Sequence, residues 1–216
     1  MCVNIVSWNT FGGGIAKLAQ APRYTVRQDM PNIFFVQEGG SVGGIPDEVE
    51  IGGELYKTFF FKQPDDGSHR LSIGILLQEK AFDEYEIGQF PGPGKRPIVY
   101  YESDDFIAAT AHLTACSAVA KDELKRLNDT MKDKYTDKHW LVMGDFNCEP
   151  ESLDASALGL NIYTPGYLTH NGEKTLDFLI CSDSFNGHLE VDIASDDFGF
   201  TANASDHYPI RCIVNL

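Results

Sequence analysis

Apolar residues come mostly in short runs along this chain, a pattern typical of β-strands. The runs predict strands at about 3–8, 32–37, 55–61, 70–77, 85–90, 97–102, 105–113, 139–143, 176–181, 188–193 and 208–214. The spacing of Leu124, Leu127 and Met131 predicts a helix over about 118–134, and a second helix is expected near 15–29. Many strands with a few interspersed helices predict two packed sheets flanked by helices, in a single domain over residues 1–216.

Polar residues that can carry chemistry stand at the ends of several of these runs. Asp145 and Asn147 belong to a Gly-Asp-Phe-Asn segment directly after the run 140–143. On extended backbone, residues two apart point to the same side, so this strand end presents a carboxylate and an amide together. Gly and Asn are also ordinary turn residues after a strand. The other strand-linked polar positions, which turns alone explain poorly, are Asn9, Glu38, His112 and Asp206-His207.

Two of these positions suggest a cation site. Glu38 follows the apolar run 33–37, where a carboxylate is usually just the first solvated residue of a strand end. Together with Asp206 it could instead hold Mg²⁺, which takes oxygen ligands and keeps several waters.

The remaining candidates suit phosphate chemistry. His112 is either a core histidine or, together with His207, a donor to phosphate oxygens near neutral pH. Asp177 lies inside an apolar run, where a carboxylate needs a partner, and the imidazole of His207 is the favoured one. Arg96 is either a surface cation or a phosphate clamp, for which its guanidinium is well shaped.

Composition narrows the classes of function. The 216 residues carry a formal net charge of −15, which excludes a general attraction for nucleic acid. A polyanionic substrate would therefore need a divalent metal and local cations. Apolar residues make up 43% of the chain, but no run approaches the roughly 18 residues of a membrane-spanning helix.

Cysteine usage and the N-terminal sequence bear on the compartment. The five cysteines are scattered without a Cys-x-x-Cys pair, which favours reduced thiols and makes a zinc site improbable. No signal peptide precedes the first apolar run, so a cytoplasmic protein is expected. A processed or toxin-like form would be secreted.

Taken together, the motifs resemble those of the metal-dependent endonuclease/exonuclease/phosphatase superfamily. The matching segments, in the family's order, are Ser7-Trp8-Asn9, Gln37-Glu38, Thr110-Ala111-His112, Gly144-Asp145-Phe146-Asn147, Thr175-Leu176-Asp177 and Ser205-Asp206-His207. His112 is typical of the deoxyribonuclease-I-like branch. Gln37-Glu38-Gly39-Gly40-Ser41 and Arg96-Pro97 look most like the catalytic subunit of cytolethal distending toxins.

The resemblance implies a four-layer α/β sandwich, with helices flanking two packed, mainly antiparallel sheets. It implies Mg²⁺ as cofactor, with Mn²⁺ or Ca²⁺ as alternatives. The implied metal ligands are Glu38, Asn9 and Asp206; the catalytic residues are His112, Asp145, Asn147, Asp177 and His207; and the substrate phosphate is held by Arg96 and Asn147.

The implied function is a metal-dependent phosphodiesterase, foremost a DNA endonuclease that contacts the DNA backbone, with a protein partner if the chain is toxin-like. The alternative is a phosphatase or phosphodiesterase acting on phosphoinositides, sphingomyelin or another small phosphate ester. A third possibility is a binding module that keeps the fold without the chemistry.

Overall fold

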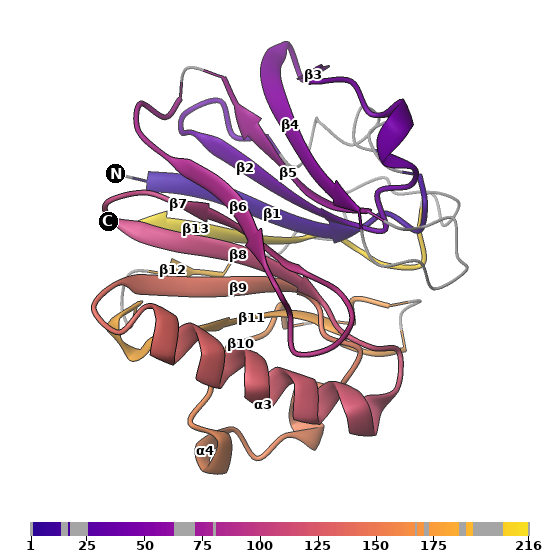
Figure 1. The fold of residues 1–216 in the computed structure, drawn as a ribbon, viewed down its shortest axis with the longest axis vertical. Coiled ribbons are helices and arrows are strands. Elements are labelled where there is room, and N and C mark those ends of the chain that lie inside the picture. Colours follow the sequence, from indigo (N-terminus) through magenta and orange to yellow (C-terminus); the bar gives the residue numbers. More distant parts are fainter. Residues whose placement is uncertain are drawn as a thin grey trace.

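A computed structural model describes residues 2–13, 17, 26–62, 72–79, 81–166, 168–170, 173–185, 189–191 and 205–215. In this part of the chain two β-sheets pack face to face, and one long helix lies against the outer face of the second sheet (Figure 1). The predicted pair of packed sheets is therefore present. Most neighbouring strands run antiparallel, and each sheet contains one parallel pair.

The first sheet has seven described strands in the order β12-β13-β1-β2-β5-β4-β3. They are β1 (Cys2–Asn9), β2 (Asn32–Gln37), β3 (Glu48–Ile51), β4 (Glu54–Lys62), β5 (Ser72–Gln78), β12 (Leu189–Glu190) and β13 (Ile210–Asn215). Only β1 and β2 run parallel, and β13 pairs antiparallel with β1 on its other side. The first and last long strands of the sheet are thus neighbours.

The second sheet has six described strands in the order β10-β11-β9-β8-β7-β6. They are β6 (Glu86–Phe90), β7 (Ile98–Glu102), β8 (Phe106–His112), β9 (His139–Asp145), β10 (Asn161–Tyr163) and β11 (Asp177–Cys181). Its parallel pair is β8 and β9, joined by a crossover that contains helix α3 (Ser117–Lys134). The remaining described helices are α4 (Ala155–Leu158) and the short 3₁₀ turns Val42–Gly44, Pro150–Ser152 and Asp183–Phe185.

A continuous apolar core fills the space between the sheets. Alternate residues of β1, β2 and β5, such as Ile5 and Phe35, meet alternate residues of β8, β9 and β11, such as Leu141 and Leu179. The period of two along a strand explains this, because every second side chain points to the same face. The facing residues are almost completely buried, so the two sheets are held at a fixed spacing by their side chains.

The outer faces of the two sheets are covered differently. Ala120, Leu124, Leu127 and Met131 of α3 pack on the outer face of the second sheet, as their helical spacing predicts. The outer face of the first sheet carries its own buried cluster, which includes Trp8. The helix predicted at 15–29 falls mostly outside the described residues, so the fourth layer stays a prediction.

The structure corrects several sequence predictions. Residues 26–29, the end of the helix predicted near 15–29, form no helix. The sequence reading missed β3 and β10, which are short and rich in polar residues. The strand predicted at 188–193 is described only at 189–190, and residues 70 and 71 of another predicted strand lie outside the described part. In the described part of the chain, none of the helices is sufficiently long and apolar to span a bilayer.

Candidate active site

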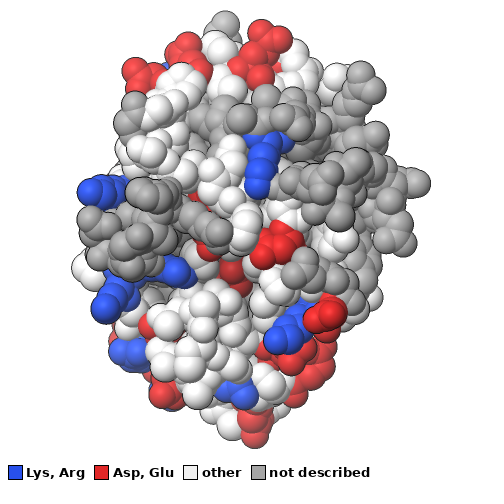
Figure 2. Space-filling view, turned by 90° about the vertical axis from the view of Figure 1, so that its right-hand side faces the viewer, with Lys and Arg blue, Asp and Glu red and all other residues white. Residues whose placement is uncertain are grey.

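The carboxyl ends of the two parallel strand pairs bring the predicted site residues together. β1 ends at Asn9 and Glu38 follows β2, while β8 and β9 end at His112 and Asp145 as direct neighbours in register. Asp177 at the start of β11 pairs with Asp145 from the other side. Figure 2 looks onto this end of the molecule, where Asp and Glu atoms lie in a central hollow.

Asp145 lies at the centre of the cluster. The side-chain amide of Asn9 donates to its Oδ2 over 3.0 Å, and the backbone N–H of Asn147 donates to its Oδ1 over 3.0 Å. The Nε2 atoms of His112 and His207 lie 3.5 and 3.6 Å from Oδ2. Burial, reinforced by the nearby charge of Asp177, raises the pKa of Asp145 to about 7. A carboxylate with such a pKa is a competent proton acceptor near neutral pH.

His207 is held in one orientation by a buried carboxylate. Its Nδ1 lies 2.8 Å from Asp177 Oδ2, which is the partner predicted for this acid. Trp8 Nε1 donates to the carbonyl of His207 over 2.9 Å, and the backbone N–H of His207 donates to the Ser205 hydroxyl over 3.1 Å. Burial alone lowers the pKa of His207, but Asp177 and then Asp145 outweigh it and raise the pKa to about 9. The ring is therefore an imidazolium at neutral pH.

His112 has the opposite electrostatic character. Burial lowers its pKa well below the usual value, and the positive charges of Arg96 and His207 lower it further. Its Nε2 lies 3.8 Å from Glu38 Oε1 and faces Asp145 as well. The site thus holds a neutral and a protonated imidazole on either side of one carboxylate.

Arg96 and Asn147, the two residues predicted to hold substrate phosphate, converge on one backbone carbonyl. Arg96 Nη1 donates to the carbonyl of Leu113 over 2.8 Å, and Asn147 Nδ2 donates to the same oxygen over 3.0 Å. Leu113 directly follows His112, so both side chains lie at the mouth of the cluster. Their role as phosphate ligands stays a prediction.

Backbone strain marks two of the predicted positions. Glu38 and Asn147 both have φ of 51°, in the left-handed region that most residues avoid. Asn tolerates this region better than Glu. At Glu38 the carbonyl accepts hydrogen bonds from the Thr10 hydroxyl over 3.0 Å and from the backbone N–H of Gly12 over 2.8 Å. The loop after β1 therefore fixes the turn that directs Glu38 into the site.

The predicted metal ligands differ in how well they fit a cation. Asp206 Oδ1 is buried and accepts no hydrogen bond from any described residue, although a buried carboxylate oxygen needs a partner. Glu38 is also partly buried at the site. Carboxylate oxygens of this kind suit Mg²⁺ or Ca²⁺. Asn9 instead accepts from the backbone N–H of Phe11 over 3.0 Å and donates to Asp145, so its contacts are those of a support for Asp145.

His170 is a site neighbour that the sequence reading assigned to the surface or core. Its ring packs edge to face on His207 with centroids 4.7 Å apart, and its Nε2 lies 3.7 Å from Asp206 Oδ2. Two groups of side chains come close enough for one ion: His170 with Asp206 and His207, and Asp145 with Asp177 and His207. A β-bridge between His170 and His207 creates the first group. No sequence motif marks that bridge.

Comparison with known proteins agrees with this geometry. The family model described as "Endonuclease/Exonuclease/phosphatase family" matches residues 6–207. A cytolethal distending toxin chain of Escherichia coli is 23% identical over 163 residues, which are 70% of this chain and 60% of that protein. The chain therefore matches less than two thirds of the length of this relative.

Solved structures share the fold. A chain of cytolethal distending toxin from Actinobacillus actinomycetemcomitans superposes with a TM-score of 0.67 and 21% identity, covering 98% of this chain and 97% of that one. The mannosyl-6-phosphatase Bt3783 of Bacteroides thetaiotaomicron superposes with a TM-score of 0.65 and 16% identity, covering 98% and 99%. Because the family model spans nearly the whole chain and the buried His and Asp cluster lies within that span, the protein belongs to the endonuclease/exonuclease/phosphatase family.

Proposed function

We propose that this chain is a divalent-cation-dependent phosphodiester hydrolase that nicks DNA. The observation that carries the proposal is Asp145, a buried carboxylate with a pKa of about 7 between two imidazoles of different charge. Hydrolysis of a phosphodiester requires an in-line water, a proton acceptor for it and donors around the phosphate. The likeness to cytolethal distending toxin chains supports DNA as the substrate.

Asp145 accepts the proton of the attacking water in this mechanism. Its Oδ1 is fixed by the backbone N–H of Asn147 and its Oδ2 by the amide of Asn9, so the carboxylate cannot turn away from the water. Both contacts are short hydrogen bonds between groups on strand ends. A base positioned in this way typically accelerates a reaction by about 10²–10⁴-fold.

Positive charge and donors surround the phosphate from the other sides. The imidazolium of His207, kept protonated by Asp177, donates from Nε2 to a phosphate oxygen or to the leaving oxygen. Neutral His112 contributes a further N–H, and Arg96 offers guanidinium N–H groups beside it. These fixed donors stabilise the negative charge that develops at phosphorus.

Glu38 and Asp206 are the residues that would hold the cation, for which Mg²⁺ is expected and Mn²⁺ or Ca²⁺ are alternatives. When bound, such a cation acts as a Lewis acid that neutralises phosphate charge. The buried Asp206 Oδ1, which no described donor satisfies, supports this assignment.

Nicking of supercoiled plasmid tests the proposal. The wild type should convert plasmid to the open-circular form with Mg²⁺ and not with EDTA, and His112→Ala should lose this activity by about 10²-fold or more. His139→Ala, at the start of β9 and away from the cluster, is the matched control. Wild-type rates in a folded His112→Ala protein would refute the assignment.

A second candidate is a hydrolase of small phosphate esters. The net charge of −15 opposes a long polyanion, and the mannosyl-6-phosphatase shares the fold. Pure wild type that leaves DNA intact but hydrolyses phosphorylated sugars, phosphoinositides or sphingomyelin would establish this alternative. Steep salt dependence of substrate affinity would instead favour DNA.

A further inference from the structure

A groove lined by positive side chains opens beside the candidate active site. It has a volume of about 390 Å³, and its walls include Lys62, Lys95, Arg96, Phe90 and Pro97. We propose that this basic groove binds a phosphate of the nucleic-acid strand beyond the one that is cleaved. The inference rests on the proposed nuclease function and extends it by naming what a longer substrate gains.

The charge of the groove is unusual for this protein. The whole chain has 17 Lys and Arg against 32 Asp and Glu, yet the described residues that line the groove include three cations and no acid. Lys and Arg side chains flank the acidic hollow on the left in Figure 2. A local positive surface in an acidic protein concentrates the favourable potential for a polyanion at one place.

The groove continues into the catalytic cluster through Arg96. The guanidinium that lines the groove also donates to the carbonyl of Leu113, and the carbonyl of His112 lies 3.4 Å from the same Nη1. A small cavity lined by Lys95, Arg96, His112 and Thr114 connects the two regions. A strand with its scissile phosphate at His112 therefore passes Arg96 before it reaches the lysines.

One acid lies at the inner end of this path, and it supports the loop. Glu123 of α3 accepts from the backbone N–H and the hydroxyl of Thr114, each over 2.8 Å. The loop that carries Lys95 packs so closely on this carboxylate that a Cβ at Gly94 would collide with it. Glu123 thus holds Lys95 and Arg96 in place.

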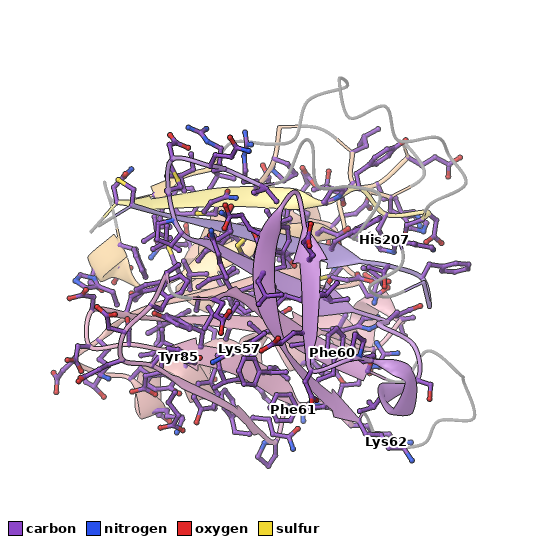
Figure 3. The ribbon with its side chains drawn as sticks, turned by 90° about the horizontal axis from the view of Figure 1, so that it is seen from above. Lys57, Phe60, Phe61, Lys62, Tyr85 and His207 are labelled. Atoms are coloured by element: carbon purple, nitrogen blue, oxygen red, sulfur yellow. The ribbon has the colours of Figure 1, made fainter. Side chains whose placement is uncertain are left out.

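The two sheets build opposite walls of the groove. Lys62 ends β4 of the first sheet, where β3 no longer pairs with it, and Phe90 ends β6 of the second. Figure 3 shows Lys62 at the same end of the molecule as His207, while Lys57 lies further back along β4.

The mixture of cations with Phe90 and Pro97 fits a phosphate and the sugar or base attached to it. The volume lies near the lower end of the roughly 300–1,000 Å³ of ligand pockets, which suits about one nucleotide unit. A substrate with a single phosphate at the catalytic cluster would leave the groove empty. The groove should therefore favour a strand over a small ester.

The test compares Lys62→Gln/Lys95→Gln with the control Lys57→Gln/Lys125→Gln, which removes the same charge elsewhere. Lys57 is on the same strand as Lys62, and Lys125 is exposed on α3. Binding of a fluorescein-labelled duplex is followed by anisotropy in Ca²⁺ at several salt concentrations. Cleavage of the duplex and of bis(p-nitrophenyl) phosphate is followed in Mg²⁺, and thermal melting checks folding.

For the groove variant we expect the slope of log affinity against log salt to decrease by about two, one for each lysine. The ratio of kcat/KM for the duplex to that for the small diester should fall about tenfold, and the control should keep both values. An unchanged slope and ratio in a wild type that cleaves DNA would overturn the groove alone. A wild type that neither binds nor cleaves DNA but hydrolyses small esters would overturn the nuclease function, and the inference with it.

Discussion

The two sheets contribute chemically different halves to the candidate site. The second sheet supplies Asp145 and Asp177, whose side chains are 2% and 1% exposed and whose oxygens face protein donors. Glu38, after a strand of the first sheet, is 16% exposed, and Asp206, before its last long strand, is 28% exposed. The same residue types therefore sit in a dry and in a partly wet environment.

This difference assigns different tasks to the carboxylates. Burial disfavours the charged form of an acid, so the inner pair perturbs pKa values and suits proton transfer. A carboxylate that reaches solvent can bind a cation that keeps part of its water shell, as Mg²⁺ does. The inner half is thus expected to govern pH dependence and turnover, and the outer half to govern metal affinity.

The largest effect is expected from the inner half. Asp145→Asn should reduce nicking by about 10³-fold, because the amide keeps the shape but cannot accept the proton. Asp129→Asn, an exposed acid on α3, is the control and should retain activity. An Asp145→Asn protein that nicks within tenfold of wild type would exclude Asp145 as the base.

The same substitution should leave the fold intact or more stable. The pKa of Asp145 is raised from 3.8 to about 7, so the folded state binds the proton more tightly than the unfolded state. The wild type therefore loses stability as pH rises through that interval. Asp145→Asn should lack this loss, which melting temperatures between pH 4 and 8 would show as a rising advantage over wild type.

A smaller effect is expected when the orientation of His207 is disturbed. Asp177→Asn removes the charge that raises the pKa of His207 to about 9, so the ring loses its proton at lower pH. We expect a loss of activity on the order of 10²-fold and an alkaline limb of the pH–rate profile that begins at lower pH than in wild type. A lowered rate with an unshifted profile would mean that Asp177 acts only through packing.

The stability of the two proteins should differ in a defined pH window. Because the folded pKa of His207 lies above its ordinary 6.5, the ion pair stabilises the fold fully below about 6.5. That contribution is lost as pH rises through about 9. Asp177→Asn should therefore cost most stability in mildly acidic solution and least above pH 9, as melting curves would measure.

Features governed by local pattern were predictable from the sequence. The strand over 32–37 and the helix over 118–134 follow from an uninterrupted apolar run and from helical spacing. The contact of Asp177 with His207 follows from the rule that a buried acid requires a partner. The β3–β4 hairpin also had a local signal that was missed, since Gly52 and Gly53 both have positive φ, as a two-residue turn requires.

Features created by tertiary pairing were not predictable. The left-handed backbone at Glu38 depends on hydrogen bonds from the loop after β1, which no local pattern encodes. The basic groove joins Lys62 and Lys95 from different sheets. His170 reaches the site only because its backbone bridges to His207. These contacts exist only once the two sheets and their connecting segments have packed.

His170 gives the smallest expected effect and tests the outer half. Its Nε2 faces Asp206 Oδ2 at 3.7 Å and its ring supports His207, so it can fix a cation-binding carboxylate without touching the proton acceptor Asp145. His170→Gln should weaken metal affinity by about tenfold, in the range found for residues that orient metal ligands.

Mn²⁺ binding measured by calorimetry, together with the Mg²⁺ concentration that gives half-maximal nicking, should both shift, and excess metal should recover most of the rate. His139→Gln serves as the control because it removes a histidine outside the cluster. If His170→Gln instead lowers the rate at saturating metal and leaves Mn²⁺ affinity unchanged, His170 belongs with the inner half. The two halves would then be separated by exposure alone, and not by the tasks assigned to them.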